Sequence, residues 1–480
     1  MPRASLTRRG PAVALALLIV AVVVGTFVYP TYPNYDSYYS LLWGRDLLHL
    51  HKPAFDVYRA PTEHPLSIAF SMVLSLLGRS GDRVMVLFTM ASLVALAMGM
   101  YRLGRAAFTP LVGVVAGALL VTRFDFPFLA ARAYIDIPYL AFIVWAAALE
   151  VERPRRGWPV LILLLLGSLM RPEAWLLAGL YVLWIGWRAP WPDRIRYAAV
   201  AAAGPLIWVA VDTIVTGHPL FSLTHTTGLA EELGRDKGLS QVPSATWTFL
   251  VGLDKLPVLL AAAAGLVLTI WLTPRRTLMP LLLLVLGLVT FFMVGVAGLS
   301  IINRYLLVPS LMIMIYAAAA LGGFTMLRGG VVQYAWAGLA VAAVAGGTIY
   351  TVAHLRSHVF TENLSFRGDS HRALVKLLDE PKVRAALKCG PLSVPNHKLV
   401  PEARWLLHRD EHGVLARSDP KNAKRTGRGV AVFTVDRTAF AIELLADPTV
   451  DHATVVRELL PQPNFTRIAT TKYFSAYANC

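Results

Sequence analysis

A small set of acidic and basic side chains interrupts this apolar sequence, and their types suit the handling of a phosphate group. The stretch 31–65 has Asp36 near its start and the pair Glu63-His64 at its end. A carboxylate can deprotonate or orient a hydroxyl group. Arginines bind phosphate and neutralise the charge on a leaving group. The candidate site residues are Asp36, Glu63, His64, Arg132, Asp136, Arg171, Glu173, Arg304 and Tyr305.

The composition indicates a membrane protein that crosses the bilayer many times. Of its 480 residues, 56% are hydrophobic and 15% are charged, whereas a soluble domain carries roughly 25% charged residues. The apolar residues form runs close to the length that spans a bilayer. The net charge of +16 comes largely from Lys and Arg in short linkers, as the positive-inside rule expects. We therefore do not expect nucleic acid as a partner.

The runs and linkers predict about 11 transmembrane helices and one re-entrant or interfacial helix. The first span covers about 12–28, and the arginines before it place the N-terminus in the cytoplasm. The run 66–77 is too short to cross a core ~30 Å thick. The run 158–187 has basic linkers on both flanks, and Pro172 breaks it into two short helices. This topology brings the candidate residues to the outer side.

Ionisable groups at membrane depth are costly, so they usually line a polar cavity or pair with each other. On this basis the constellation suits transfer of a group from an anionic lipid carrier. Simpler roles are equally compatible with the sequence. Asp36 and Asp136 are good residues for capping a helix, and Glu63-His64 could simply end the loop. Arg171 could pair with Glu173 or Asp136, Arg304 could snorkel to the interface, and the tyrosines of 29–39 could form an aromatic belt.

The C-terminal region 353–480 has the composition of a soluble domain and predicts a small extracytoplasmic α/β fold. Helix-like segments such as ALVKLLDEPKVRAAL alternate with strand-like segments such as GVAVFTV and ATVVREL. The only two cysteines, Cys389 and Cys480, both lie here. They are too few for a metal site. A disulfide between them is expected outside the cytoplasm, and a pair of free thiols is equally compatible with the sequence.

Residues 11–325 resemble the polytopic glycosyltransferases of the GT-C fold, in particular the dolichyl-phosphate-mannose–protein mannosyltransferase-like family. The landmarks occur in the family's order: an early acidic residue in NYDSYY, a charged pair before proline in EHPL, and an acidic residue at a span start in ARAYIDIPY. A basic residue between two short helices, Arg171, and the outer pair in NRYLLVP follow. The sequence departs from the family in having HPL for the usual HPP and RPE for the usual lysine motif.

The resemblance implies that the membrane domain, taken as 1–352, has the all-α GT-C architecture with 31–65 as its catalytic outer loop. The α/β domain 353–480, inferred from composition, follows it. It implies a glycosyltransferase in the inner membrane that inverts the sugar carbon. The partners implied are a polyprenyl-phosphate sugar donor, a glycan, lipid or protein acceptor, and membrane lipid. Asp36 would be the base and Asp136 a second acidic residue that orients the acceptor or a metal.

In the same comparison Arg171, Arg304 and His64 would bind the phosphate, and Glu63, Arg132, Glu173 and Tyr305 would complete the substrate site. Some relatives use a divalent metal ion and others do not, and this sequence has no ligand cluster that decides between them. A transporter or a flippase for lipid-linked sugars is the main rival, and a non-catalytic scaffold is the third alternative. The long outer loop, the C-terminal domain and the lack of clear inverted repeats argue against a transporter.

Overall fold

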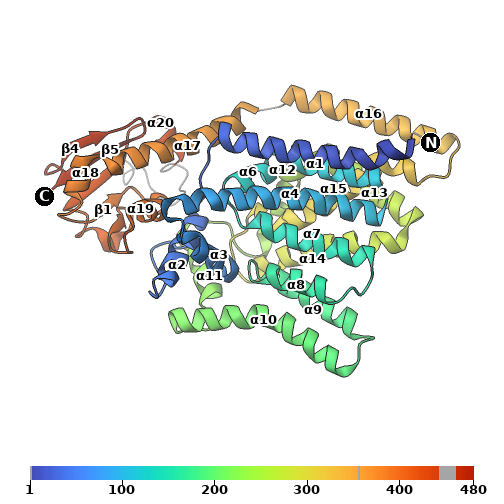
Figure 1. The fold of residues 1–480 in the computed structure, drawn as a ribbon, viewed down its shortest axis with the longest axis horizontal. Coiled ribbons are helices and arrows are strands. Elements are labelled where there is room, and N and C mark those ends of the chain that lie inside the picture. The colour runs from blue at the N-terminus through green and yellow to red at the C-terminus, as the bar shows by residue number, and fades with distance from the viewer. Residues whose placement is uncertain (1–2, 355–356, 443–460) are drawn as a thin grey trace. The chain divides into compact units, whose positions relative to one another are not determined.

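The computed structural model describes residues 3–354, 357–442 and 461–480, and the chain divides into two compact units (Figure 1). Unit 1 contains 1–28, 87–210 and 236–360, and unit 2 contains 29–86, 211–235 and 361–480. Each unit therefore combines segments that are far apart in the sequence. The boundary near residue 353 between a membrane domain and a C-terminal α/β domain remains a prediction.

Unit 1 is a bundle of apolar helices. Its helices are α1 (Arg3–Val28), α4 (Gly81–Ala107), α5 (Pro110–Thr122), α6 (Asp125–Ala131), α7 (Asp136–Glu152), α8 (Trp158–Ser168), α9 (Glu173–Gly186), α10 (Trp191–Thr216), α12 (Val242–Asp254), α13 (Leu256–Leu272), α14 (Pro274–Val296), α15 (Leu307–Gly322) and α16 (Val331–His354). Helices α4 and α10 each extend by a few residues into unit 2.

Helix α15 forms the core of this bundle because nearly all of its side chains are buried. It packs closely on α13 at Gly265, where an added Cβ would lie 1.9 Å from the Tyr316 carbonyl oxygen. Only a residue without a side chain permits this approach of the two backbones. The buried α15 in turn fixes the position of the short 3₁₀ helix η3 (Asn303–Leu306) that precedes it.

Six described helices are long and apolar enough to cross a membrane, and the number rises to eight if two strongly bent pairs each count as one span. The remaining apolar helices are shorter. They include α8 and α9, which meet at Pro172 as predicted, and α3 (Pro65–Ser75), which is as short as expected for 66–77. The structure thus describes a multi-pass membrane protein, and the predicted total of about 11 spans remains a prediction.

Unit 2 combines short helices with a five-stranded sheet. The helices are α2 (Tyr35–Leu48), α3, α11 (Phe221–Glu232), α17 (Ser357–Asp379), α18 (Pro381–Ala386), α19 (Val400–Leu407) and α20 (Arg437–Phe440). The strands are β1 (Leu392–Val394), β2 (Val414–Ala416), β3 (Gly429–Thr434), β4 (Thr466–Thr470) and β5 (Phe474–Asn479). Their order in the sheet is β2-β1-β3-β5-β4.

The sheet confirms the predicted α/β character of the C-terminal region. Strand β1 pairs in parallel with β2 and β3, whereas β5 pairs antiparallel with β3 and β4. The segment GVAVFTV forms β3, whose residues are all buried. The predicted strand ATVVREL lies outside the described residues. Cys389 and Cys480 form a disulfide, so the alternative of two free thiols is wrong.

Two simpler interpretations of the first loop are also corrected in unit 2. The residue that caps α2 is Asn34, whose side chain accepts a hydrogen bond from the Ser37 N–H, while Asp36 lies in the first turn of the helix. Tyr38 and Tyr39 are each only 1% exposed. They therefore belong to the core of unit 2, and an aromatic belt does not describe them.

Candidate active site

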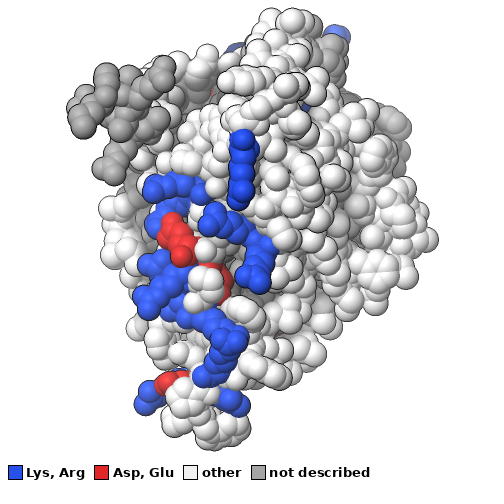
Figure 2. Space-filling model, turned by 90° about the vertical axis from the view of Figure 1, so that its right-hand side faces the viewer, with Lys and Arg blue, Asp and Glu red and all other residues white. Residues whose placement is uncertain are grey.

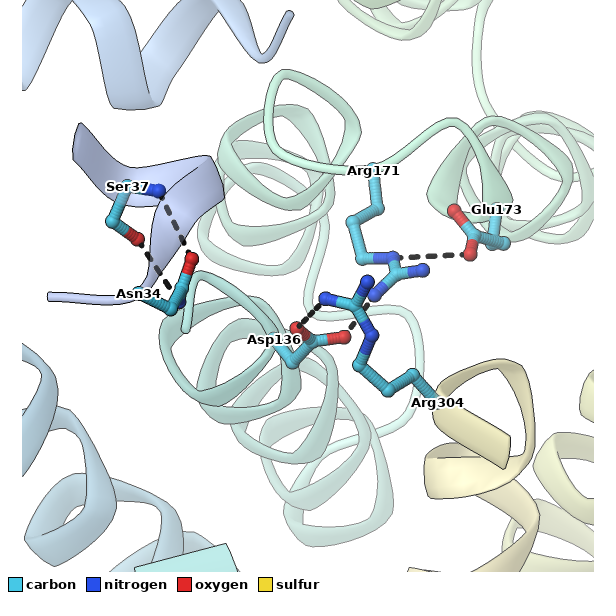
Figure 3. A network of polar contacts seen from close by, with 6 residues as sticks. All are labelled: Asn34, Ser37, Asp136, Arg171, Glu173 and Arg304. Carbon is cyan, nitrogen blue, oxygen red and sulfur yellow. Dashed lines mark hydrogen bonds and ion pairs between the residues drawn. The ribbon is translucent and has the colours of Figure 1, made fainter. Parts of the chain in front are cut away.

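Asp136 is the centre of a charged cluster in unit 1 (Figure 3). Its side chain is fully buried. It forms ion pairs with Arg171 Nη1 and, at 3.3 Å, with Arg304 Nη1. Asp136 is the first residue of α7, where a negative charge interacts favourably with the helix N-terminus. The residue at the N-cap is Ile135, so Asp136 holds two arginines and does not itself cap the helix.

The backbone around Asp136 explains how it reaches this position. The chain enters α7 through a tight turn in which Ala133 has a φ of 56°. Pro138 lies in the first turn of the helix, where its missing N–H breaks no helical hydrogen bond. The motif AYIDIPY therefore begins a helix at the aspartate.

Arg171 lies in the break between α8 and α9, where Pro172 prevents a continuous helix. Its Nε donates to Glu173 Oε1 at 3.0 Å. Its guanidinium carbon lies 5.2 Å from the centre of the Tyr305 ring and 5.8 Å from that of the Tyr139 ring. Arg171 is therefore bound by carboxylates from two helices and lies against two aromatic rings, which fixes the direction of its side chain.

Arg304 approaches the same aspartate from η3. Its guanidinium carbon lies 5.1 Å from the centre of the Tyr134 ring, and its side chain is 26% exposed. The ion pair with Asp136 shows that Arg304 does more than snorkel to an interface.

These residues line one pocket of unit 1. Its polar wall consists of the two arginines, the carboxylates of Asp136 and Glu173, and the two tyrosines 139 and 305. The rest of the wall is mainly aliphatic: Leu140, Leu177, Leu283, Leu286, Leu307 and Val308. The two arginines and two carboxylates balance in formal charge. Such a pocket combines donors for an anion with an apolar surface.

The remaining sequence-predicted residues are not among those that line this pocket. Arg132, at the end of α6, has its guanidinium 5.8 Å from the centre of the Phe128 ring. Asp36, Glu63 and His64 belong to unit 2, and His64 occupies the N-cap position of α3. Of the nine predicted residues, the structure thus gathers Asp136, Arg171, Glu173, Arg304 and Tyr305 in one pocket.

Glu63 forms a second carboxyl cluster, in unit 2, with residues that the sequence analysis did not single out. The Ser222 hydroxyl lies 2.7 Å from both Glu63 Oε1 and Asp212 Oδ1. Burial, and then the neighbouring Asp212 carboxyl, raise the pKa of Glu63 to about 8. The geometry agrees, because one hydroxyl proton cannot serve two carboxylates. A sequence signal for Asp212 did exist, since it is an acidic residue in the apolar run VAVDTIV.

The described residues contain no group of three or more His, Cys, Asp or Glu side chains that could hold a metal ion. The carboxyl pair of Glu63 and Asp212 supplies only two such ligands. The divalent metal ion that the sequence analysis left open thus has no matching donor set in the described part of the chain, and we derive no reaction step through a metal.

No protein-family model matches the sequence, and no curated protein matches it. Solved structures do resemble it. ArnT from Cupriavidus metallidurans in the apo state is 15% identical, the match covers 98% of each chain, and the TM-score is 0.53. AglB, the oligosaccharyltransferase from Archaeoglobus fulgidus, in complex with an inhibitory peptide and a dolichol-phosphate, is 12% identical with a TM-score of 0.54. That match covers 97% of this chain and 74% of AglB.

A further structure of the Archaeoglobus fulgidus oligosaccharyltransferase, in complex with Zn and sulfate, is 11% identical with a TM-score of 0.53, and the match covers 96% of this chain and 73% of that one. At these identities the likeness concerns the fold. The chain has the GT-C fold, as the sequence resemblance predicted. Among the proteins compared, ArnT matches over almost the full length of both chains.

Proposed function

We propose that the protein is a membrane glycosyltransferase. It transfers a sugar from a polyprenyl-phosphate carrier to an acceptor of the cell envelope, at the outer face of the inner membrane. The observation that carries this proposal is the convergence of Arg171 and Arg304 on Asp136 in a pocket with aliphatic walls. Two guanidinium groups suit a phosphate, and the leucines suit the first part of a prenyl chain.

The reaction we infer is a single displacement at the sugar carbon. The acceptor hydroxyl oxygen forms a bond to this carbon while the bond from the carbon to the phosphate oxygen breaks. The electron pair of that bond leaves with the polyprenyl phosphate, and the acceptor proton passes to a carboxylate. Attack from the side opposite the leaving phosphate inverts the configuration.

Arg171 and Arg304 would stabilise the charge that develops on the leaving phosphate. Asp136 would hold both guanidinium groups in place, and Tyr305 would support Arg171 from its ring face. A pre-formed pair of donors costs little reorganisation during the reaction, which is the condition under which such electrostatic stabilisation is effective.

We assign the role of base to Asp36 on the sequence resemblance. Glu63, His64 and Arg132 are proposed substrate-binding residues on the same ground. Glu63 differs from an ordinary carboxylate, because with a pKa of about 8 it holds a proton near neutral pH. It would therefore bind a substrate oxygen as a hydrogen-bond donor.

The similar structures support the donor class. AglB was solved with a dolichol-phosphate, which is a polyprenyl-type phosphate. We infer a donor of the same chemical class here. We also infer that the N-terminus is cytoplasmic and that the C-terminal α/β region is extracytoplasmic, in agreement with its disulfide.

The test is sugar transfer by purified protein in detergent with a panel of radiolabelled polyprenyl-phosphate sugars and crude envelope acceptor. We expect Asp36→Asn to slow transfer by about 10²-fold or more because the base is lost. Asp56→Asn, an exposed aspartate of the same loop, is the matched control and should retain the wild-type rate. Equal rates for wild type and Asp36→Asn would remove Asp36 from the mechanism.

The same assay tests the enzyme class. Consumption of a donor by wild-type protein supports glycosyl transfer. If no donor of the panel is consumed, and the protein in liposomes moves lipid-linked sugar across the bilayer, the proposal is wrong and the protein is a flippase.

A further inference from the structure

A second cluster of charged and aromatic side chains lies in unit 1, where the loop 153–157 follows α7. The buried carboxylate of Glu150 organises this loop. It accepts hydrogen bonds from the backbone N–H groups of Arg155 and Arg156, at 2.7 and 3.3 Å. It also accepts from the Tyr181 hydroxyl at 2.9 Å and from Trp184 Nε1 at 2.8 Å. Backbone and aromatic donors thus occupy this carboxylate.

Arg155 is held in an uncommon conformation by this arrangement. Its φ is 60°, which a non-glycine residue seldom adopts without support from its surroundings. Its guanidinium carbon lies 4.4 Å from the centre of the Trp184 ring. Arg155 Nη1 is buried and has no hydrogen-bond partner among the described residues. The loop therefore holds a partly exposed guanidinium side chain against an aromatic face, and the described part of the protein does not use the donor at Nη1.

The neighbourhood of Arg155 is basic. The exposed arginines here are Arg153 of the same loop, Arg188 between α9 and α10, and Arg194 and Arg196 near the start of α10. The acidic residues nearby are already paired, Glu152 with Arg102 and Arg156, and Asp193 with Arg196. Figure 2 shows Lys and Arg side chains gathered in a stripe on this end of the molecule, with few acidic side chains among them.

Exposed tryptophans accompany these arginines. Trp184, Trp187 and Trp191 are 49%, 81% and 69% exposed. In Figure 1 the turn between α9 and α10 and the turn between α7 and α8 lie at the same end of unit 1 as the N-terminus. Tryptophan is the side chain that favours the headgroup level of a bilayer. A site for a dissolved anion would have no need of this apolar surface.

We propose that Arg155 and Trp184 form a binding site for the phosphodiester headgroup of an anionic glycerophospholipid. The lipid belongs to the leaflet at the end of unit 1 that carries these two turns. The guanidinium group of Arg155 binds the phosphodiester, and Trp184 and Trp187 contact the glycerol and the upper acyl chains. The surrounding arginines attract anionic lipid over neutral lipid. This site is separate from the pocket around Asp136 and does not depend on the proposed transfer reaction.

The test is native mass spectrometry of the full-length protein from a neutral detergent, titrated with dioctanoyl phosphatidylglycerol. Phosphatidylcholine of the same chain length and inorganic phosphate are titrated in parallel. Loss of one arginine contact at a membrane surface corresponds to about a fivefold change in affinity. We therefore expect Arg155→Gln to weaken phosphatidylglycerol binding about fivefold.

Arg105→Gln is the matched control, because Arg105 is also an exposed arginine of unit 1. It should change the affinity by less than about twofold. Arg155→Lys keeps the charge but loses the planar group that stacks on the indole, so an intermediate affinity is expected. If Arg155→Gln does not fold, the affinity of Arg155→Lys serves as the test in its place.

Three outcomes would overturn the proposal. One is an equal effect of Arg155→Gln and Arg105→Gln, which would reduce the site to a general charge effect. Another is equal affinity for phosphatidylcholine and phosphatidylglycerol. The third is complete competition by inorganic phosphate at the same concentration, which would identify an anion site without lipid selectivity.

Discussion

Glu173 should compete with the phosphate of the donor for Arg171. In the structure without ligand, Arg171 is bound by Asp136 and by Glu173, whose Oε1 lies 3.0 Å from Arg171 Nε. The two arginines and two carboxylates of the pocket carry no net charge. A phosphate that binds Arg171 must therefore either displace Glu173 or remain close to its negative charge.

Glu173→Gln removes this charge and keeps the size of the side chain and its carbonyl acceptor. A phosphate on the far side of the guanidinium group would lie roughly 7 Å from Glu173, where two unit charges at an effective dielectric constant of 20 repel by about 2 kcal/mol. This corresponds to about thirtyfold in affinity. We expect Glu173→Gln to bind polyprenyl phosphate at least about tenfold more tightly than wild type, after allowance for screening.

The assay is equilibrium binding of a short-chain polyprenyl phosphate to purified protein in detergent, with donor turnover measured alongside. Tighter binding of the product should lower kcat while KM for the donor falls. Glu152→Gln, which removes an equal charge from a more exposed ion pair with Arg102, should leave the affinity unchanged. Weaker or unchanged binding by Glu173→Gln would refute the competition and would make Glu173 a structural partner of Arg171.

Other predictions concern stability and covalent structure. Asp136→Asn removes the negative charge that both arginines contact in a buried site, so it should lower the free energy of unfolding by about 3–5 kcal/mol, measured by thermal unfolding in detergent. The surface change Asp193→Asn is the control and should cost less than about 1 kcal/mol. Similar losses in the two variants would contradict the buried ion pairs. Burial raises the pKa of Glu63 from 4.5 to about 8, so the native state binds this proton more tightly than the unfolded chain does. The resulting contribution to stability is fully present below about pH 4.5 and is lost as the pH rises through 8. Protease resistance of wild type should fall over this window, and the same fall in Glu63→Gln would remove Glu63 as its cause. Intact mass under non-reducing conditions should show Cys389 and Cys480 bridged, and alkylation of both thiols without a reductant would contradict the disulfide. Replacing both cysteines with serine should lower the free energy of unfolding by about 2–4 kcal/mol.

The C-terminal region shows which features of a fold a local sequence pattern can predict. The alternation of helix-like and strand-like segments predicted the α/β character, and β3 covers the first six residues of GVAVFTV. The pattern did not predict that β1 lies between β2 and β3, and the sequence left open whether Cys389 and Cys480 are bridged or free. Strand order, and whether two distant cysteines come close enough to form a disulfide, depend on contacts between distant segments, which a single sequence does not record.

The sequence alone determined the class of protein and the local breaks of its helices. Hydropathy and the distribution of arginines act over one helix length, so they identify a multi-pass membrane protein. Proline acts on its own helix, so Pro172 predicted the break between α8 and α9 that holds Arg171.

Only the tertiary structure decided which charges meet. Asp136 bonds Arg171 and Arg304, which are 35 and 168 positions away in the sequence. Glu63 and Ser222 are 159 positions apart, and this contact was not predicted. Helix packing decides these meetings, because a buried charge is stable only where packing brings it a partner. The sequence named the charged residues and left the partner of Arg171 open between Glu173 and Asp136, and the structure shows both contacts. The pocket around Asp136 follows from the packing of α7, α8, α9 and η3.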